Sequence, residues 1–218
     1  SLAIWTPIVA GLLVLATGGD KNAGLARWVA LLGSLAGFVV SIPLFTGFQS
    51  LNGGMQFVEK APWIASLNIH YYLGVDGISM LFVVLNSFTT VMVVLAGWEV
   101  IQQRVAQYMA AFLIMSGLIN GAFAALDAIL FYVFFEAMLI PMFLIIGVWG
   151  GPRRIYAALK FFLYTFLGSV LMLVALIYLY IKGGSFQLAD LYALRLSAQE
   201  QTWIFFAFMI AFAVKVPM

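Results

Sequence analysis

Apolar runs of membrane-spanning length constrain this chain more than any other feature of its sequence. Of its 218 residues, 65% are hydrophobic and 8% are charged, and the mean hydropathy is +1.12. A soluble domain carries roughly 25% charged residues. An apolar helix of about 20 residues crosses the hydrocarbon core and keeps its backbone hydrogen bonds internal. The pattern therefore predicts an all-α polytopic membrane protein.

The order of the apolar runs predicts about seven transmembrane helices. The expected spans are Leu2–Ala16, Trp28–Phe48, Ile78–Trp98, Tyr108–Leu126, Ala128–Trp149, Ile155–Ile181 and Thr202–Met218. Together they form a single membrane domain over residues 1–218, with three helices and a long loop in 1–98 and the remaining helices in 108–218. The opening run lacks a basic region followed by a small-residue cleavage site, so no removable signal peptide is expected. The final run stops inside an apolar segment, which predicts a fragment of a longer chain.

Basic residues in the loops predict the orientation in the membrane. The first, third and fifth loops hold Lys21, Arg27, Arg104, Arg153 and Arg154. The second, fourth and sixth loops hold Lys60, Lys182 and Arg195. Because cytoplasmic loops carry the excess of lysine and arginine, the first set is expected in the cytoplasm and Ser1 outside.

Composition excludes several kinds of site. The chain contains no cysteine, which removes disulfides, thiolate-bound iron–sulfur clusters and cysteine zinc sites. His70 is the single histidine, so the chain cannot supply both ligands of a bis-histidine haem. The net charge of +2 is too small to predict a nucleic acid partner.

The longest loop, residues 49–77, contains the alternating segment SLNIHYYLG, which predicts a short hairpin over the outer face. His70 lies in this segment, where it is expected to be solvated or to brace the loop. Asp76 and Asp127 stand directly before apolar runs, so each is expected to cap the helix that follows.

Glu136 is an acid inside an otherwise apolar run, FYVFFEAMLIPMF. The helical rise places it about 14 Å from Asp127 and about 20 Å from Trp149, near the middle of the membrane. An ionised carboxylate there costs several kcal/mol unless it is paired or hydrated. Pro141 should free a backbone carbonyl close to the same turn. We therefore expect a proton relay at Glu136, with a glutamate that only locks helices through a hydrogen bond as the alternative.

Lys215 is the expected partner of this acid. It lies about 18 Å beyond Trp203 by the helical rise, and so also near the middle of the membrane. Lysine, unlike arginine, can lose its proton when it is buried. Pro217 follows two residues later and should break the helix. The alternative is a fixed ion pair that only holds helices together.

Lys160 is a third candidate for the relay. Its place near one end of the sixth span also fits a lysine that extends to the membrane surface. The same helix carries Tyr164, Thr165, Gly168 and Ser169 within one arc. This arc either lines a hydrated path or packs against another helix, and packing is favoured for Gly168 and Ser169.

Several segments together resemble the antiporter-like membrane subunits of respiratory complex I, and within them the subunit M family. The segments are FFEAMLIPMFLIIGVWGG, ALKFFLYTFLGSVLML, IAFAVKVP, and LGVDGIS before the third span. The resemblance covers essentially the whole chain. It implies a fold of roughly fourteen helices with two inverted five-helix repeats, each with a broken helix. Residues 108–218 would then supply the first four helices of the first repeat, truncated near the break at Lys215 and Pro217.

The resemblance also implies roles for these residues. By motif match, Glu136 is similar to the family's essential glutamate, Lys215 to the lysine at the helix break, and Lys160 to a lysine on the sixth helix. The implied function is that of a proton-translocating subunit of NADH-quinone oxidoreductase, a translocase. No cofactor is expected in this chain, and NADH, FMN, iron–sulfur clusters and quinone are expected in partner subunits.

The resemblance implies partners and a location as well. The expected partners are the other complex I membrane subunits, above all neighbouring antiporter-like subunits, and the lipid bilayer. The expected location is the bacterial inner membrane, ahead of the mitochondrial inner membrane.

Two alternatives stay open from the sequence. An Mrp-type cation/proton antiporter subunit or a membrane-bound hydrogenase subunit would share the fold and the Glu–Lys pair. Sodium-dependent exchange without NADH would favour the antiporter. A structural scaffold would use the ion pair only to hold helices, so a neutral substitution at Glu136 would lower assembly while any assembled complex pumped normally.

Overall fold

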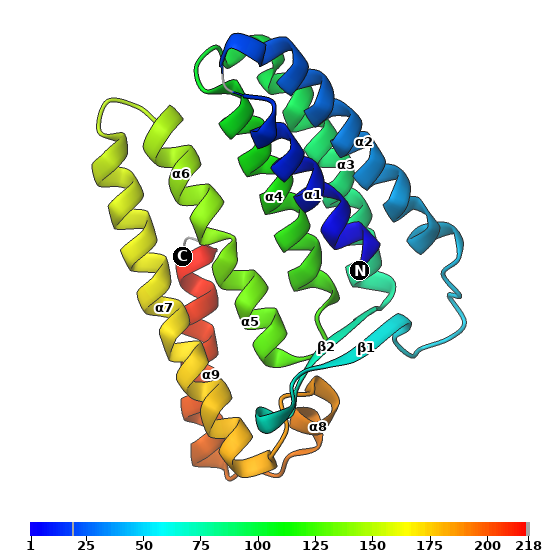
Figure 1. The fold of residues 1–218 in the computed structure, drawn as a ribbon. Helices are drawn as coiled ribbons and strands as arrows, with labels where there is room; N and C mark the ends of the chain where they lie inside the picture. Colours follow the sequence, from blue (N-terminus) through cyan, green and yellow to red (C-terminus); the bar gives the residue numbers. More distant parts are fainter. Residues whose placement is uncertain (19, 217–218) are drawn as a thin grey trace.

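Helices make up most of the molecule, and a two-stranded hairpin and a short helix lie at one end of them (Figure 1). The computed structural model describes residues 1–18 and 20–216. The helices are α1 (Leu2–Ala16), α2 (Ala23–Thr46), α3 (Gly77–Val100), α4 (Val105–Ala124), α5 (Ala128–Ala137), α6 (Leu139–Trp149), α7 (Arg154–Gly183), α8 (Leu188–Ala193) and α9 (Ala198–Lys215). Two short 3₁₀ turns, η1 (Asp20–Asn22) and η2 (Ala65–Leu67), lie in the loops.

Five helical segments of the described chain are long and apolar enough to cross a membrane: α2, α3, α4, the α5–α6 pair and α7. Helix α1 is apolar but shorter, at 15 residues, and α9 has 18 residues. The prediction of a helical membrane protein is confirmed. A helix stands at each of the expected spans, but a count of seven crossings stays a prediction.

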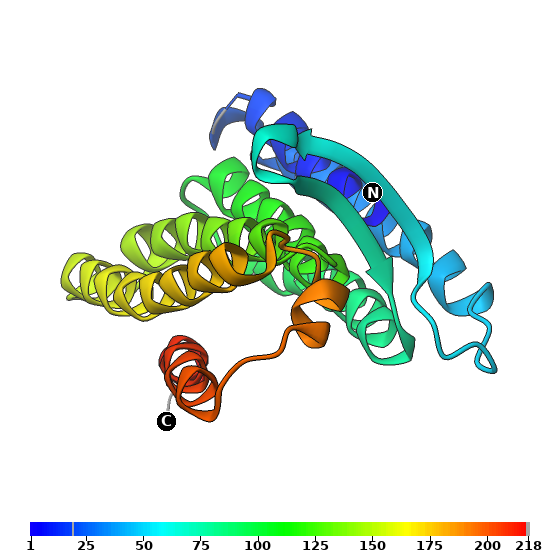
Figure 2. The same ribbon diagram turned by 90° about the horizontal axis from the view of Figure 1, so that it is seen from below.

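The loops sort to the two ends of the bundle. The α1–α2, α3–α4 and α6–α7 connections lie at one end, and the hairpin, the α4–α5 connection and α8 lie at the other (Figure 1). This up-and-down order places the two predicted sets of basic loop residues at opposite ends. Seen from below, α1 and α9 lie on opposite sides of the layer that contains α4 and α7 (Figure 2).

Close approach of small residues holds α1, α2 and α4 together. A side chain added at Gly33 on α2 would place its Cβ 2.4 Å from the Cβ of Ala10 on α1. One added at Gly117 on α4 would lie 2.4 Å from the carbonyl oxygen of Ile4. Both distances are too short for any side chain, so these glycines set the helix spacing, as small residues commonly do in membranes.

A buried polar network joins α1, α3 and α4. Asn86 donates from Nδ2 to Asn120 Oδ1 at 2.8 Å and to the Ser116 carbonyl at 3.0 Å. Asn120 in turn donates to the Ala3 carbonyl at 2.9 Å, and Thr90 donates to Ser116 Oγ at 2.7 Å. Hydrogen bonds of this kind link helices where lipid offers no competing partner. No local sequence pattern predicts that these residues pair.

The predicted hairpin is present as the antiparallel pair β1 (Gln56–Ile64) and β2 (Ile69–Val75). Fully buried Asp127 ties it to the helices, because the His70 amide donates to Asp127 Oδ2 at 3.0 Å. The other oxygen of the same carboxylate accepts from the amides of Ile129 and Leu130 in the first turn of α5. Asp127 therefore caps α5 as predicted, and it also anchors the strand that braces the bundle end.

Candidate functional site

The fifth apolar run is broken in the middle. Helix α5 ends at Ala137, α6 begins at Leu139, and Met138 joins them. Pro141 supplies the physical reason, because its ring lacks an amide hydrogen for the Ala137 carbonyl and crowds that turn. The run predicted as one helix is therefore two half-helices in line.

The break leaves backbone carbonyls free in the centre of the run. Helical bonding stops with Met138 N donating to Phe134 O and resumes with Met142 N donating to Met138 O, each at 3.3 Å. Between these two points Pro141 has no amide hydrogen for the Ala137 carbonyl, and the Phe135 carbonyl accepts from a side chain outside this helix. Carbonyls freed in this way need another donor inside a membrane.

Lys215, in the last turn of α9, is that donor. Its Nζ donates to the Phe135 carbonyl oxygen at 2.8 Å. The same nitrogen lies 3.4 Å from the centre of the Phe135 ring, where a cation is attracted by the ring face. Figure 1 shows the end of α9 at the level of the α5–α6 junction. Because Phe135 precedes Glu136, the predicted lysine reaches the residue next to the predicted acid.

The Glu136 carboxylate itself is half-buried and incompletely bonded. Its Oε1 is buried and has no hydrogen-bond partner in the part of the chain that the structure describes. No ion pair joins it to Lys215 among the described residues, although its charge acts on both Lys215 and Tyr132. An unpaired buried carboxylate oxygen is costly, so the Glu136 carboxylate lacks a hydrogen-bond donor that its position in the membrane calls for.

Helix α7 positions α9, and with it Lys215. A side chain added at Gly168 would lie 2.8 Å from Val214 Cγ2, so the bare glycine lets α9 approach. Below this contact Met172, Leu176 and Ala211 form a shared apolar core with Phe135. Gly168 is thus a packing residue, which is the reading that the sequence favoured.

The other end of α9 is fixed by an acid that the sequence analysis missed. Glu200 closes a capping box with Ser197 and pairs with Lys182 Nζ at 2.9 Å. Tyr178 donates a further hydrogen bond to Glu200, and together these bonds hold the pKa of the Glu200 carboxyl well below its usual range. The spacing of serine and glutamate before an apolar run would have predicted the cap. Nothing local predicts the contacts with α7.

Lys160 lies apart from the other two candidates. Its side chain is exposed on α7, with Nζ 5.9 Å from the centre of the Tyr156 ring. It precedes Gly168 by eight residues, or about 12 Å along the helix. Thr165 and Ser169 are buried but donate to carbonyls of their own helix. The structure therefore places Lys215 at the residue next to Glu136 and leaves Lys160 outside this cluster.

Two further expectations concern residues or groups beyond this cluster. Pro217 lies outside the residues that the structure describes. Across the described residues, no group of three His, Asp or Glu side chains could hold a metal ion.

Comparison with known sequences finds relatives over almost the whole chain. Residues 125–218 match the family described as NADH:quinone oxidoreductase/Mrp antiporter, TM. The chain is 52% identical over 212 residues to NADH-quinone oxidoreductase subunit M of Rhodobacter capsulatus, covering 91% of this chain and 40% of that protein. It is 43% identical over 224 residues to subunit M of Rickettsia prowazekii, covering 100% and 45%. It is 43% identical over 211 residues to NADH-ubiquinone oxidoreductase chain 4 of Arabidopsis thaliana, covering 96% and 43%.

Comparison with solved structures gives the same fold. A chain of respiratory complex I from Thermus thermophilus with bound NADH matches with a TM-score of 0.86 and 33% identity, over 99% of this chain and 44% of that chain. A chain of the Mrp complex from Dietzia sp. DQ12-45-1b matches with a TM-score of 0.79 and 16% identity, over 98% and 23%. The second likeness is one of fold alone.

The chain spans a little under half the length of the curated relatives it matches. With the apolar helices, the bacterial subunit M relatives identify a multi-pass protein of the bacterial inner membrane. From its sequence over almost its whole length, and from its fold, the chain belongs to the NADH-quinone oxidoreductase subunit M family.

Proposed function

We propose that this chain is the N-terminal part of a proton-translocating membrane subunit of NADH-quinone oxidoreductase. The observation that carries the proposal is the cluster at the α5–α6 break, where Lys215 bonds the Phe135 carbonyl beside a half-buried, incompletely bonded Glu136. A lysine and an acid at a similar depth in the membrane can titrate as a coupled pair, so that a charge change at one alters the proton affinity of the other. The redox groups and the quinone site belong to partner subunits.

The proposed mechanism is electrostatic. Redox energy released elsewhere in the complex changes the charge balance between Glu136 and Lys215. Lys215 then gains or loses a proton, and Lys160 passes it onward along buried water. Lys160 lies about 12 Å along α7 from Gly168, where α9 contacts this helix, so the relay needs water or further side chains between Lys215 and Lys160. An arginine could not replace Lys215, because its proton is not released at physiological pH.

The proposal includes the larger architecture. The complete subunit has about fourteen transmembrane helices in two inverted repeats, and this chain supplies about seven of them. The second repeat, whose helices would follow α9, continues the proton path. The neighbours in the membrane are other complex I subunits, above all further antiporter-like ones.

The test is NADH-driven acidification of inverted membrane vesicles that carry Glu136→Gln in the full-length subunit. Glu99→Gln is the matched control, because Glu99 is an exposed acid at the end of α3. We expect normal assembly with strongly reduced acidification and coupled quinone reduction for Glu136→Gln, and unchanged values for Glu99→Gln. Normal pumping per NADH in an assembled Glu136→Gln complex would show that Glu136 is structural.

A second candidate is a cation/proton antiporter subunit, which is favoured by the shared family description and by the fold of the Mrp complex. It predicts sodium-dependent proton exchange by the same vesicles without NADH. A scaffold role predicts instead that Glu136→Gln lowers only the amount of assembled complex.

A further inference from the structure

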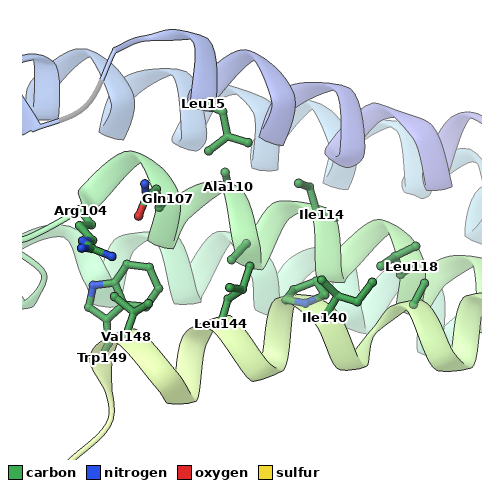
Figure 3. Close-up of a pocket in the computed structure, with 13 residues that line it drawn as sticks. Leu15, Arg104, Gln107, Ala110, Ile114, Leu118, Ile140, Leu144, Val148 and Trp149 are labelled. Atoms are coloured by element: carbon green, nitrogen blue, oxygen red, sulfur yellow. The ribbon is translucent and has the colours of Figure 1, made fainter. Parts of the chain in front are cut away.

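An apolar groove runs along the bundle between α1, α4 and the α5–α6 pair (Figure 3). Its volume is about 490 Å³, which lies within the range of small-molecule sites in proteins. Leu15, Ile114 and Leu144 stand on its walls, and Ala110 lies between them. The methyl side chain of Ala110 is too short to fill the space between the larger residues.

The mouth of the groove carries a cation and an interfacial aromatic residue. Arg104 precedes the first turn of α4, and its side chain is exposed. No carboxylate pairs with Arg104 in the described part of the chain. Trp149 lies beside it and donates from Nε1 to the Gln103 carbonyl at 2.9 Å. Tryptophan at a helix end is typical of the headgroup level of a bilayer.

The length of the groove fits one leaflet. Its walls extend along α4 from Arg104 to Leu118, or about 21 Å by the helical rise. Half of the hydrocarbon core is about 15 Å thick. The inner end is lined by Ala137 and Pro141, which flank the α5–α6 break. The groove therefore begins at headgroup level and ends near the middle of the membrane.

We propose that this groove binds an anionic phospholipid, with one acyl chain along α4 and the phosphate on Arg104. The apolar walls select a hydrocarbon chain, and the unpaired guanidinium selects a phosphate, which it can bind with two parallel hydrogen bonds. The loops at this end carry the larger set of basic residues, where anionic headgroups concentrate. Helix α9 lies on the opposite side of the bundle (Figure 2), and none of the residues that line the groove belongs to it.

The bound chain has a consequence for the break. The end of the acyl chain lies against Ala137. The Ala137 carbonyl has no helical hydrogen bond, because residue 141 is a proline and has no amide hydrogen. A hydrocarbon chain there keeps water away from this side of the break. The side that faces α9 then holds the polar contacts, as the bond from Lys215 to Phe135 requires.

The test uses the assembled complex with the full-length subunit, reconstituted with phosphatidylglycerol that carries a photoreactive diazirine in one acyl chain. Phosphatidylethanolamine with the same chain is the comparison probe. Illumination and mass spectrometry of peptides locate the adducts. We expect adducts from phosphatidylglycerol on α4 and α6 residues that line the groove, such as Ile114 and Leu144, and fewer from phosphatidylethanolamine.

Variants separate the headgroup contact from the groove. Arg104→Asn keeps a residue that tolerates the left-handed backbone at this position (φ 53°) and should lower groove labelling by phosphatidylglycerol about fivefold. Arg104→Lys should restore most of it. Leu144→Trp fills the groove from a partly exposed position and should remove the adducts. Arg153→Asn, at an exposed arginine of the same bundle end that does not line the groove, should change nothing.

Two results would overturn the proposal. If both probes label the groove equally and Arg104→Asn changes nothing, the groove does not select an anionic headgroup. Absence of lipid adducts from the groove in the assembled complex, with Leu144 instead crosslinked to protein, would show that a protein segment occupies it.

Discussion

Replacing the proline at the break tests whether the break itself matters. Pro141→Ala supplies an amide hydrogen at position 141 for the Ala137 carbonyl and removes the ring that crowds that turn. The helix can then run continuously from α5 into α6. A helical hydrogen bond to the Ala137 carbonyl would form, where the proline allows none.

Two free energies decide whether Pro141→Ala forms a continuous helix or keeps the break with Lys215 bonded to Phe135. Removing a proline from the interior of a helix stabilises the continuous helix by about 3 kcal/mol. Against this stands the bond from Lys215 to the Phe135 carbonyl, which is worth about 1.5–3 kcal/mol because its donor is charged. We therefore expect the continuous helix to form and to take the Phe135 carbonyl from Lys215. Losing that bond lowers the fraction of molecules with Lys215 in place by about 10- to 100-fold.

The assay measures two quantities on the assembled complex. Thermal unfolding should show a more stable subunit, while NADH-driven acidification of inverted vesicles should fall by at least about tenfold. Pro43→Ala is the control, since Pro43 lies inside α2, far from the site along the chain. That variant gains a helical amide and should pump normally. A Pro141→Ala complex that is more stable and still pumps at the wild-type rate would refute the argument that the break serves proton transfer.

Three further predictions concern the supports of the site. Gly168→Leu should push Val214 and α9 outward, lowering thermal stability by about 1–3 kcal/mol and reducing acidification. Asp127→Ala removes the cap of α5 and leaves the His70 amide without an acceptor, so thermal unfolding should show a loss of about 2–4 kcal/mol. Asp76→Ala should cost about 1 kcal/mol at neutral pH. The backbone hydrogen bond from Ser79 lowers the pKa of Asp76 in the folded protein, so this contribution is present above the unfolded pKa of about 3.9. The contribution of the Asp76 cap should be lost as the pH falls through the folded pKa. The check is to compare the unfolding of the wild-type and Asp76→Ala proteins between pH 3 and pH 7, in steps of about one unit.

Matched variants make these three outcomes decisive. Gly147→Ala adds a methyl group at ordinary contact distance from Ala158, 3.6 Å, and should be tolerated. Asp127→Asn keeps a capping oxygen and should cost less than Asp127→Ala. A loss at Asp76 that stays constant down to pH 3, about one unit below the unfolded pKa, would contradict the assigned cap.

Local sequence patterns predicted much of the architecture. The apolar runs predicted the helices, because burying an unpaired backbone in lipid leaves few alternatives to a helix. Asp76 and Asp127 predicted helix starts, because a carboxylate before an apolar run bonds the first free amides of a helix. Counting residues also placed Glu136 and Lys215 at similar depth, since the helical rise is nearly constant.

The exact partners of the site residues could not be predicted in this way. The sequence favoured a pair between Glu136 and Lys215, but the structure joins Lys215 to the Phe135 carbonyl instead. A backbone acceptor has no sequence signature, and Pro141 frees it only in the folded chain. Lys160 has the same residue type as Lys215, yet the rotation of α7 about its axis leaves it exposed.

What the sequence determined by itself is therefore everything that depends on one segment at a time: which runs are helical, where they start, and how deep each charge lies. Tertiary structure alone decided which faces meet. Gly168 lets α9 approach α7, Asn120 joins α4 to the start of α1, and Ala110 leaves a groove open beneath α1. The physical reason is that helix rotation and spacing are set by the packing of side chains from segments far apart in the chain, and no local pattern records that packing.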